Sequence, residues 1–139
     1  MISRWSALLA LQRATHTTLH VLSEQVADLG LTPAEINVLA NLSDGKRRTV
    51  SELGRLAGAA PTTLTSVLDR LDRRGHVTRG RHPSDRRAVV VELTPAGRRA
   101  ATTIRQAIGR LERRALAALD TEAIAGLRAG LDALAEVDG

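Results

Sequence analysis

The interior of this chain has to be built almost without aromatic side chains. Trp5 is the only aromatic residue among 139, and Phe and Tyr are absent. Hydrophobic residues still make up 43% of the sequence, which is typical of a folded protein rather than a disordered one. Leu, Ala, Val and Ile must therefore fill the core, and these side chains favour packed helices over a β-sandwich. We expect one mainly α-helical domain.

The composition and the apolar runs exclude several classes of protein. Without cysteine, the chain has no disulfide framework, no zinc finger and no thiol redox switch. Its longest uncharged run, from Leu56 to Leu68, contains Pro61 and is too short to span a bilayer. The apolar stretch at residues 7–11 is too short for a secretory signal. We therefore expect an intracellular protein with no membrane partner.

The positive charge is concentrated in the middle of the chain. Residues 46–99 contain 13 basic and 5 acidic residues, whereas residues 1–45 contain 2 and 4 and residues 100–139 contain 5 and 6. A basic module between acidic flanks indicates contact with a polyanion such as double-stranded DNA. A set of solvated surface arginines is the alternative interpretation.

The N-terminal third predicts two helices separated by a glycine. Apolar residues three or four positions apart predict an amphipathic helix over residues 3–29, and Gly30 can adopt the left-handed conformation that ends a helix. Thr32, Pro33 and Glu35 then form the pattern of a capping box with proline in the first helical position. This second helix should end at the turn-forming residues 43–45.

Residues 49–75 predict a helix-turn-helix. A second capping box at Thr49–Glu52 opens a short helix, and a longer helix follows over Pro61–Arg74. Gly58 and Gly75 end the two helices. Two helices joined by a tight turn that contains glycine are the supersecondary pattern of many DNA-binding proteins.

A β-hairpin is predicted directly after the helix-turn-helix. Residues 76–79 and 88–93 are rich in residues that favour strands, and the basic, turn-forming loop 80–87 separates them. A hairpin in this position is a wing, and its loop contains three arginines: Arg81, Arg86 and Arg87.

Two further helices complete the chain. The first runs from Pro95 to about Leu119, and residues 120–122 form a break with a new helix cap. At about 24 residues the first of them is roughly 36 Å long, which exceeds what a compact winged module can cover. The second carries an apolar seam whose residues are spaced 3, 4 and 3 apart: Ile124, Leu127, Leu131 and Leu134. So narrow a seam favours pairing with a second subunit.

The stretch from Leu31 to Gly97 resembles the MarR family of bacterial winged-helix transcription regulators. Its most specific part runs from Asp85-Arg86-Arg87 to Leu93-Thr94-Pro95-Ala96-Gly97 and is similar to the family signature. The resemblance implies a mainly α-helical fold with a small β-hairpin wing: a winged helix-turn-helix lobe over residues 31–97, and a helical dimerisation region over residues 1–30 and 98–139. The implied partner in a homodimer is a second copy of the chain, held by Leu8, Leu11, Leu111, Leu127, Leu131 and Leu134.

The resemblance also implies which residues contact DNA. Pro61–Arg74 is similar to a recognition helix, with Thr62, Thr63, Thr65 and Ser66 near base edges and phosphates. Further along, Arg70, Arg73 and Arg74 would contact phosphates or pair with Asp69 and Asp72. In the wing, the family pattern has Asp85 orient Arg87 into the minor groove, with Arg81 and Arg86 beside phosphates. An exposed Asp85–Arg87 ion pair without a role in DNA binding is the alternative, and it would contribute less than about 1 kcal/mol.

The remaining candidate chemistry lies at two histidines. His16 and His20 are four residues apart on the predicted first helix, a spacing that can hold a metal together with further ligands such as Glu24. The alternatives are ordinary polar residues near the dimer crevice, or part of the small-molecule pocket that is common in the family. We predict no bound metal and no cofactor. The chain also has no nucleophile elbow and no complete phosphate loop, so an enzyme is not expected.

The sequence therefore predicts a dimeric, sequence-specific DNA-binding regulator, a repressor of a pseudo-palindromic operator that a small-molecule effector relieves. A winged-helix architectural or partner-binding DNA protein that needs no ligand is the alternative.

Overall fold

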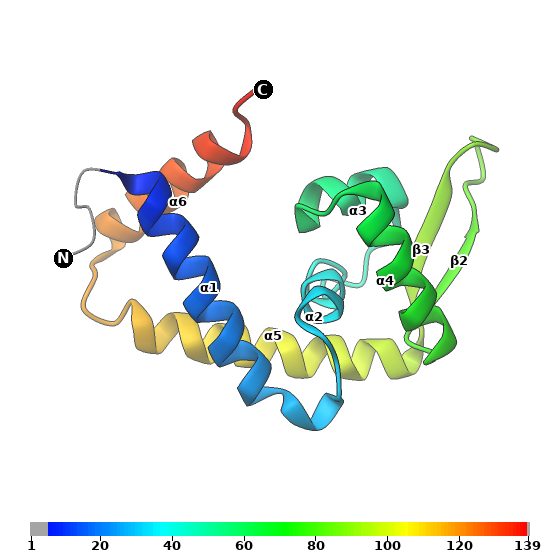
Figure 1. Cartoon of the computed structure of the whole chain (residues 1–139), viewed down its shortest axis with the longest axis horizontal. Helices are drawn as coiled ribbons and strands as arrows, with labels where there is room; N and C mark the ends of the chain where they lie inside the picture. Colours follow the sequence, from blue (N-terminus) through cyan, green and yellow to red (C-terminus); the bar gives the residue numbers. More distant parts are fainter. Residues whose placement is uncertain (1–5, 139) are drawn as a thin grey trace. The chain divides into compact units, whose positions relative to one another are not determined.

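The computed structural model describes residues 6–138. Trp5 and the predicted start of the first helix at residue 3 lie outside this range. The elements follow in the order α1 (Ala7–Gln25), η1 (Ala27–Leu29), α2 (Pro33–Ala40), β1 (Arg48–Thr49), α3 (Val50–Ala57), α4 (Pro61–Arg73), β2 (Val77–Arg81), β3 (Val89–Leu93), α5 (Pro95–Ala115) and α6 (Thr121–Ala135) (Figure 1). The predicted fold class, mainly α with a small β-hairpin wing, is confirmed.

The chain divides into two compact units. The first ends at Ala107 and contains α1–α4, the sheet and most of α5. The second begins at Ile108 and contains the rest of α5 and α6. None of the helices in the described residues is long and apolar enough to cross a membrane.

Local sequence signals set most of the helix ends in the first unit. Thr32 and Glu35 form the predicted capping box at the start of α2. Gly30 and Gly58 adopt the left-handed conformation, with φ of 63° and 64°. At the start of α4 the residue Ala60 provides no side-chain cap, so Pro61 in the first turn is the sequence signal that begins this helix.

The capping box predicted at Thr49 is only half formed. The Thr49 hydroxyl accepts a hydrogen bond from the Glu52 N–H at 3.1 Å, but the Glu52 carboxylate accepts from the same hydroxyl rather than from the Thr49 backbone. The backbone of Thr49 belongs to β1 and lies opposite Val90 of β3.

Helices α1 and α5 are shorter than predicted. The helix expected over residues 3–29 is α-helical only to Gln25, and a single 3₁₀ turn, η1, carries the chain on to Gly30. Helix α5 ends at Ala115 instead of Leu119. In the turn that follows, the Leu119 N–H donates to the Leu116 carbonyl, three residues back. Tightening of the last turn is common at helix ends.

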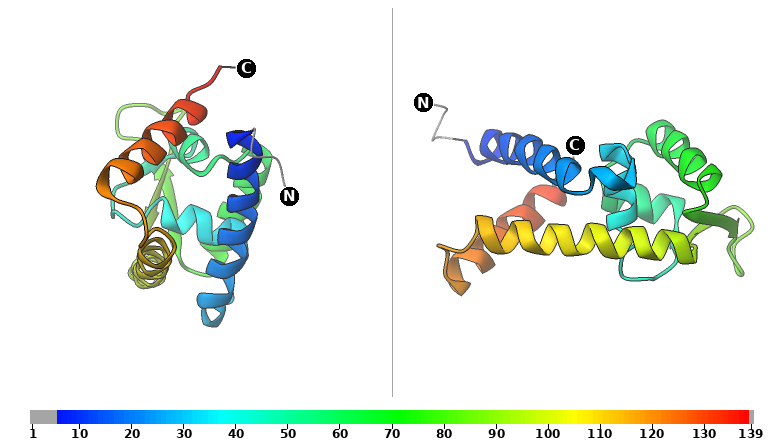
Figure 2. Two further views of the ribbon diagram at one scale, coloured as in Figure 1. Left: turned by 90° about the vertical axis from the view of Figure 1, so that its left-hand side faces the viewer. Right: turned by 90° about the horizontal axis from the view of Figure 1, so that it is seen from below.

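The sheet has three antiparallel strands in the order β1-β3-β2. The hairpin pairs Val77 with Leu93 and Arg81 with Val89, and it projects beyond the helices of the first unit (Figures 1 and 2). Strand β1 was not predicted, because two residues are too few to show an alternating pattern.

The core of the first unit is aliphatic, as expected from the composition. Leu39 of α2, Leu53 of α3, Leu71 of α4, Val91 of β3 and Ile104 of α5 are all fully buried. The core therefore joins helix-turn-helix, wing and the first part of α5 into one module.

The start of α5 lies directly against the turn after α4. The Thr94 hydroxyl donates to the Gly75 carbonyl at 2.5 Å, and the Thr94 N–H donates to the His76 carbonyl at 3.0 Å. Gly97 is buried above the same His76 carbonyl, and a Cβ at this position would overlap with that oxygen. Only glycine permits this approach of two backbones.

Helix α6 buries no side chain within the chain itself. Leu127, Leu131 and Leu134 of its predicted seam are 44%, 38% and 37% exposed. The other leucines predicted for dimerisation are exposed or half-buried: Leu8, Leu11 and Leu111.

Candidate nucleic-acid interface

Helix α4 separates an apolar face from a polar one. Leu64, Val67, Leu68 and Leu71 are buried against the core. The predicted base-reading residues are all exposed on the opposite side: Thr62, Thr63, Thr65 and Ser66. The polar face therefore carries a row of small hydroxyl side chains, each of which can donate or accept a hydrogen bond.

An open groove connects this polar face to the wing. It has a volume of about 560 Å³ and is lined by the start of α3, by α4 and by the wing loop. Thr65, Asp85 and Arg87 all line it. Three residues that were predicted to contact DNA thus face one groove, although they come from two separate segments of the chain.

Within the wing loop, Asp85 holds the backbone of Arg87. Its carboxylate accepts a hydrogen bond from the Arg87 N–H at 2.9 Å, and its carbonyl accepts from the Ala88 N–H at 3.2 Å. Among the described residues, no ion pair joins the Asp85 carboxylate to the Arg87 guanidinium. Asp85 therefore fixes the point from which the Arg87 side chain leaves the loop, and the exposed guanidinium stays available.

Arg79, which was not predicted as a site residue, joins the wing to α4. Arg79 of β2 donates to Asp69 at 2.8 Å and to Asp72 at 3.1 Å. The hydrogen bond to Asp69 raises the pKa of Arg79 above its usual value, so the guanidinium stays charged. Of the two alternatives for the arginines of α4, pairing with Asp69 and Asp72 is not what the described residues show, because β2 brings Arg79 alongside the two acids.

The arginines of α4 have different surroundings. Arg70 donates to the Ser66 hydroxyl at 3.0 Å, whereas Arg73 is exposed. Arg74 bonds to backbone carbonyls far away in the sequence. Burial, together with the charge of Arg74, lowers the pKa of the neighbouring His76.

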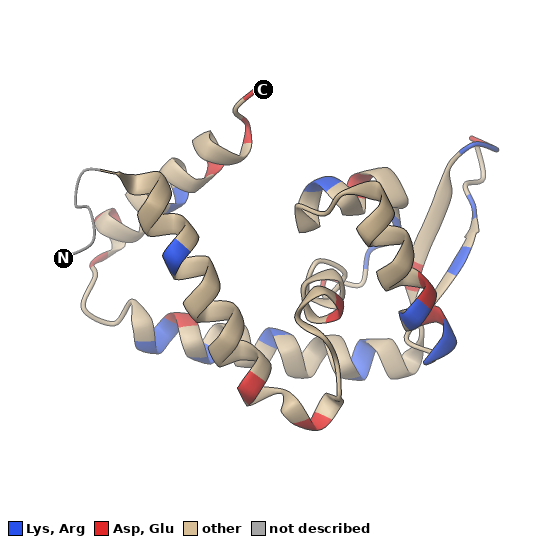
Figure 3. Cartoon of the chain, viewed as in Figure 1, with Lys and Arg blue, Asp and Glu red and all other residues tan. Residues whose placement is uncertain are grey.

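Basic residues lie along the wing and at the end of α4, with acidic residues among them. Figure 3 shows blue segments at the end of α4, along β2 and at the tip of the hairpin. The predicted wing arginines Arg81, Arg86 and Arg87 are exposed. This arrangement can neutralise several phosphates of a polyanion.

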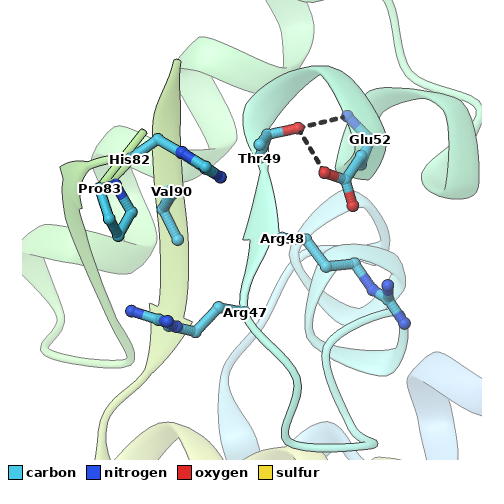
Figure 4. A pocket seen from close by; sticks show the side chains of 7 residues that line it. All are labelled: Arg47, Arg48, Thr49, Glu52, His82, Pro83 and Val90. Carbon is cyan, nitrogen blue, oxygen red and sulfur yellow. Dashed lines mark hydrogen bonds between the residues drawn. The ribbon is translucent and has the colours of Figure 1, made fainter. Parts of the chain in front are cut away.

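A second, smaller groove of about 320 Å³ lies beside the wing (Figure 4). Arg47, Arg48, His82 and Val90 are among its lining residues. Arg48 is bonded to Asp44 at 2.6 Å, while Arg47 is exposed. Arg47 adds a basic group that the motif-based prediction did not include.

The histidines singled out on α1 do not form a cluster. His16 and His20 are exposed, and His20 contacts Glu24 at 3.2 Å. Within residues 6–138, no three His, Cys, Asp or Glu side chains come together as a metal site.

Known proteins resemble this chain in both sequence and fold. The model of the MarR family matches residues 29–88, which include the helix-turn-helix and most of the wing. The HTH-type transcriptional repressor YetL of Bacillus subtilis is 35% identical over 81 residues, which are 57% of this chain and 48% of YetL. The chain thus matches about half the length of this curated relative.

Solved structures match almost the whole chain. A mutant MarR from E. coli complexed with operator DNA has a TM-score of 0.71 and 27% identity over 95% of this chain and 98% of its own. NadR in complex with 4-hydroxyphenylacetate has a TM-score of 0.86 at 20% identity, over 99% of both chains, and shows the same fold. Residues 29–88 thus match the model of the MarR family, and almost the whole chain has the fold of a solved MarR structure.

Proposed function

We propose that this protein is a sequence-specific transcriptional repressor that binds a pseudo-palindromic operator as a homodimer and releases it when a small molecule binds. The observation that carries this proposal is the groove that Thr65 of α4 shares with Asp85 and Arg87 of the wing. A protein that reads DNA with a helix and a wing needs these two elements on one face.

In this proposal α4 lies in the major groove. Its first two turns present four hydroxyl side chains, which bond to base edges or phosphates with little discrimination between donors and acceptors. Arg70 and Arg73 then lie near the phosphates of the DNA backbone. The wing reaches the minor groove through Arg87, while Arg81 and Arg86 contact phosphates. A narrow minor groove attracts arginine through its enhanced negative potential.

The proposed dimer uses the exposed leucines of the helical ends. Leu127, Leu131 and Leu134 keep 37–44% of their surface exposed within the chain, and a second copy would remove this surface from water. Two lobes held in this way would read two half-sites, which explains why the operator should be pseudo-palindromic.

Release by an effector follows if a ligand binds one arrangement of the two lobes more tightly than the other. The NadR structure contains 4-hydroxyphenylacetate, and we propose a small organic molecule in the same role for this chain. His16 and His20 on α1 remain the proposed contacts. No catalytic step is part of the proposal, and we expect the protein in the cytoplasm.

The Arg87→Ala substitution should weaken operator binding by about 1–3 kcal/mol, which is roughly 5- to 150-fold in Kd. The loop conformation should survive, because Asp85 bonds to the backbone of residue 87 and not to its side chain. Fluorescence anisotropy with an operator duplex measures the change.

The matched control is Arg110→Ala, an exposed arginine of α5 outside the lobe, which should bind like the original protein. An unchanged affinity of the Arg87 variant would remove the wing from the mechanism. If the protein instead coats any duplex with the same salt-sensitive affinity, it is an architectural DNA protein and not an operator-specific repressor.

A further inference from the structure

The C-terminal end of α4 is attached to the segment between α1 and α2. The guanidinium of Arg74 donates to the Gly30 carbonyl at 2.8 Å and to the Leu29 carbonyl at 3.0 Å. These carbonyls belong to the end of η1, the single turn that directly follows α1. Two segments 44 and 45 residues apart in the sequence are thereby joined by one side chain.

A buried carboxylate, that of Glu35, lies next to the guanidinium of Arg74. Glu35 is 3% exposed; its Oε1 accepts from the Thr32 N–H at 3.1 Å as part of the capping box. Its Oε2 has no hydrogen-bond partner in the described part of the chain and lies 3.8 Å from Nη1 of Arg74. Nε of Arg70 lies 3.9 Å from Oε1. A charge buried this deeply is strongly unfavourable unless cations face it, so Glu35 attracts two arginines of α4.

The geometry of the contact requires arginine. The planar guanidinium offers donors in a fixed fork, which reaches two neighbouring carbonyls at once. The ammonium group of lysine is a compact point charge on a flexible stem and cannot hold both carbonyls in this geometry. Gly30, with its φ of 63°, turns the chain where these carbonyls lie.

We propose that Arg74 is a positioning residue, which fixes the recognition helix α4 to the end of η1 so that the placement of α1 sets the affinity for DNA. The proposal rests on the DNA-binding function proposed above. It assigns Arg74 a task different from the phosphate contact that was predicted for it from sequence.

The first test measures operator affinity as a function of salt for Arg74→Lys. The variant keeps the charge but should lose about tenfold in affinity, with the slope of log K against log salt unchanged. If Arg74 instead contacted a phosphate directly, lysine would supply the same charge, and both the affinity and the slope would stay close to those of the original protein. Arg73→Gln, which removes an exposed arginine proposed to contact phosphate, is the comparison and should reduce the slope.

The second test does not depend on DNA. Because the chain has no cysteine, spin labels attach only at introduced sites, and Thr18→Cys on α1 with Thr63→Cys on α4 form a suitable exposed pair. The distance between the labels should be narrowly distributed with Arg74 and broader with Lys at position 74. Circular dichroism confirms that each labelled variant is folded.

The outcomes separate the two proposals. If Arg74→Lys binds the operator as tightly as the original protein, Arg74 does not act by positioning α4. An unchanged label distribution would overturn the inference as well. If the original protein shows no preference for any sequence, the proposed function fails, whereas the label distances still decide whether Arg74 holds α4.

Discussion

Gly97→Ala is expected to lower the free energy of unfolding by about 3 kcal/mol. A Cβ at position 97 would overlap with the backbone carbonyl oxygen of His76 and would also press against the Leu93 side chain at 3.2 Å. A backbone carbonyl cannot rotate away as a flexible side chain can. The start of α5 would have to separate from the turn between α4 and β2, which would also strain the Thr94 hydrogen bonds there.

Gly54→Ala is the matched control for this prediction. Gly54 lies inside α3, and a Cβ there would make only ordinary contacts of 3.5 Å with Ala59 and Leu64. Since alanine is favoured over glycine within a helix by about 1 kcal/mol, this variant should be slightly more stable than the original protein. Urea unfolding followed by circular dichroism measures both. A Gly97 variant that is as stable as the Gly54 variant would show that α5 does not require this close approach.

The double substitution Leu131→Asp and Leu134→Asp is expected to dissociate the proposed dimer and to weaken operator binding about 100-fold or more. Both leucines keep more than a third of their surface exposed within the chain, and circular dichroism checks that the variant keeps the helical fold of the monomer. The substitutions would place four carboxylates in an apolar seam shared by two copies. Without the dimer, each lobe binds its half-site alone and loses the benefit of the linked second lobe.

Ala125→Asp with Ala129→Asp controls for the added charge. Both alanines are exposed on α6, and the helical repeat places them on the side opposite the leucine seam. Sedimentation should find a dimer for this control and a monomer for the leucine variant. A leucine variant that remains dimeric would show that the seam of α6 is not the subunit interface.

Features that depend on neighbouring residues were predictable from the sequence. The capping box at Thr32, the glycine turns at Gly30 and Gly58 and the proline start of α4 all lie where the pattern indicates. Each depends on a side chain or a backbone preference within three or four residues. The strand-favouring segments on either side of loop 80–87 likewise identified the wing, and the loop has the expected place after α4.

Features that depend on tertiary contacts were not predictable in the same way. Strand β1 exists because β3 lies beside it, and its two residues carry no pattern of their own. Arg79 contacts Asp69 and Asp72 only because the folded hairpin lies beside α4. Glu35 was recognised as a capping residue, but its burial beside Arg74 depends on the packing of α2 against α4.

The most direct test of the whole account is the selection of fragments from the source genome by the purified protein, followed by footprinting of the enriched fragments. We expect the fragments to share an inverted repeat whose half-sites are centred about 10 base pairs, or a multiple of one helical turn, apart. One dimer should protect each repeat. Enrichment of no common sequence, with all duplexes bound equally and released by moderate salt, would contradict the account.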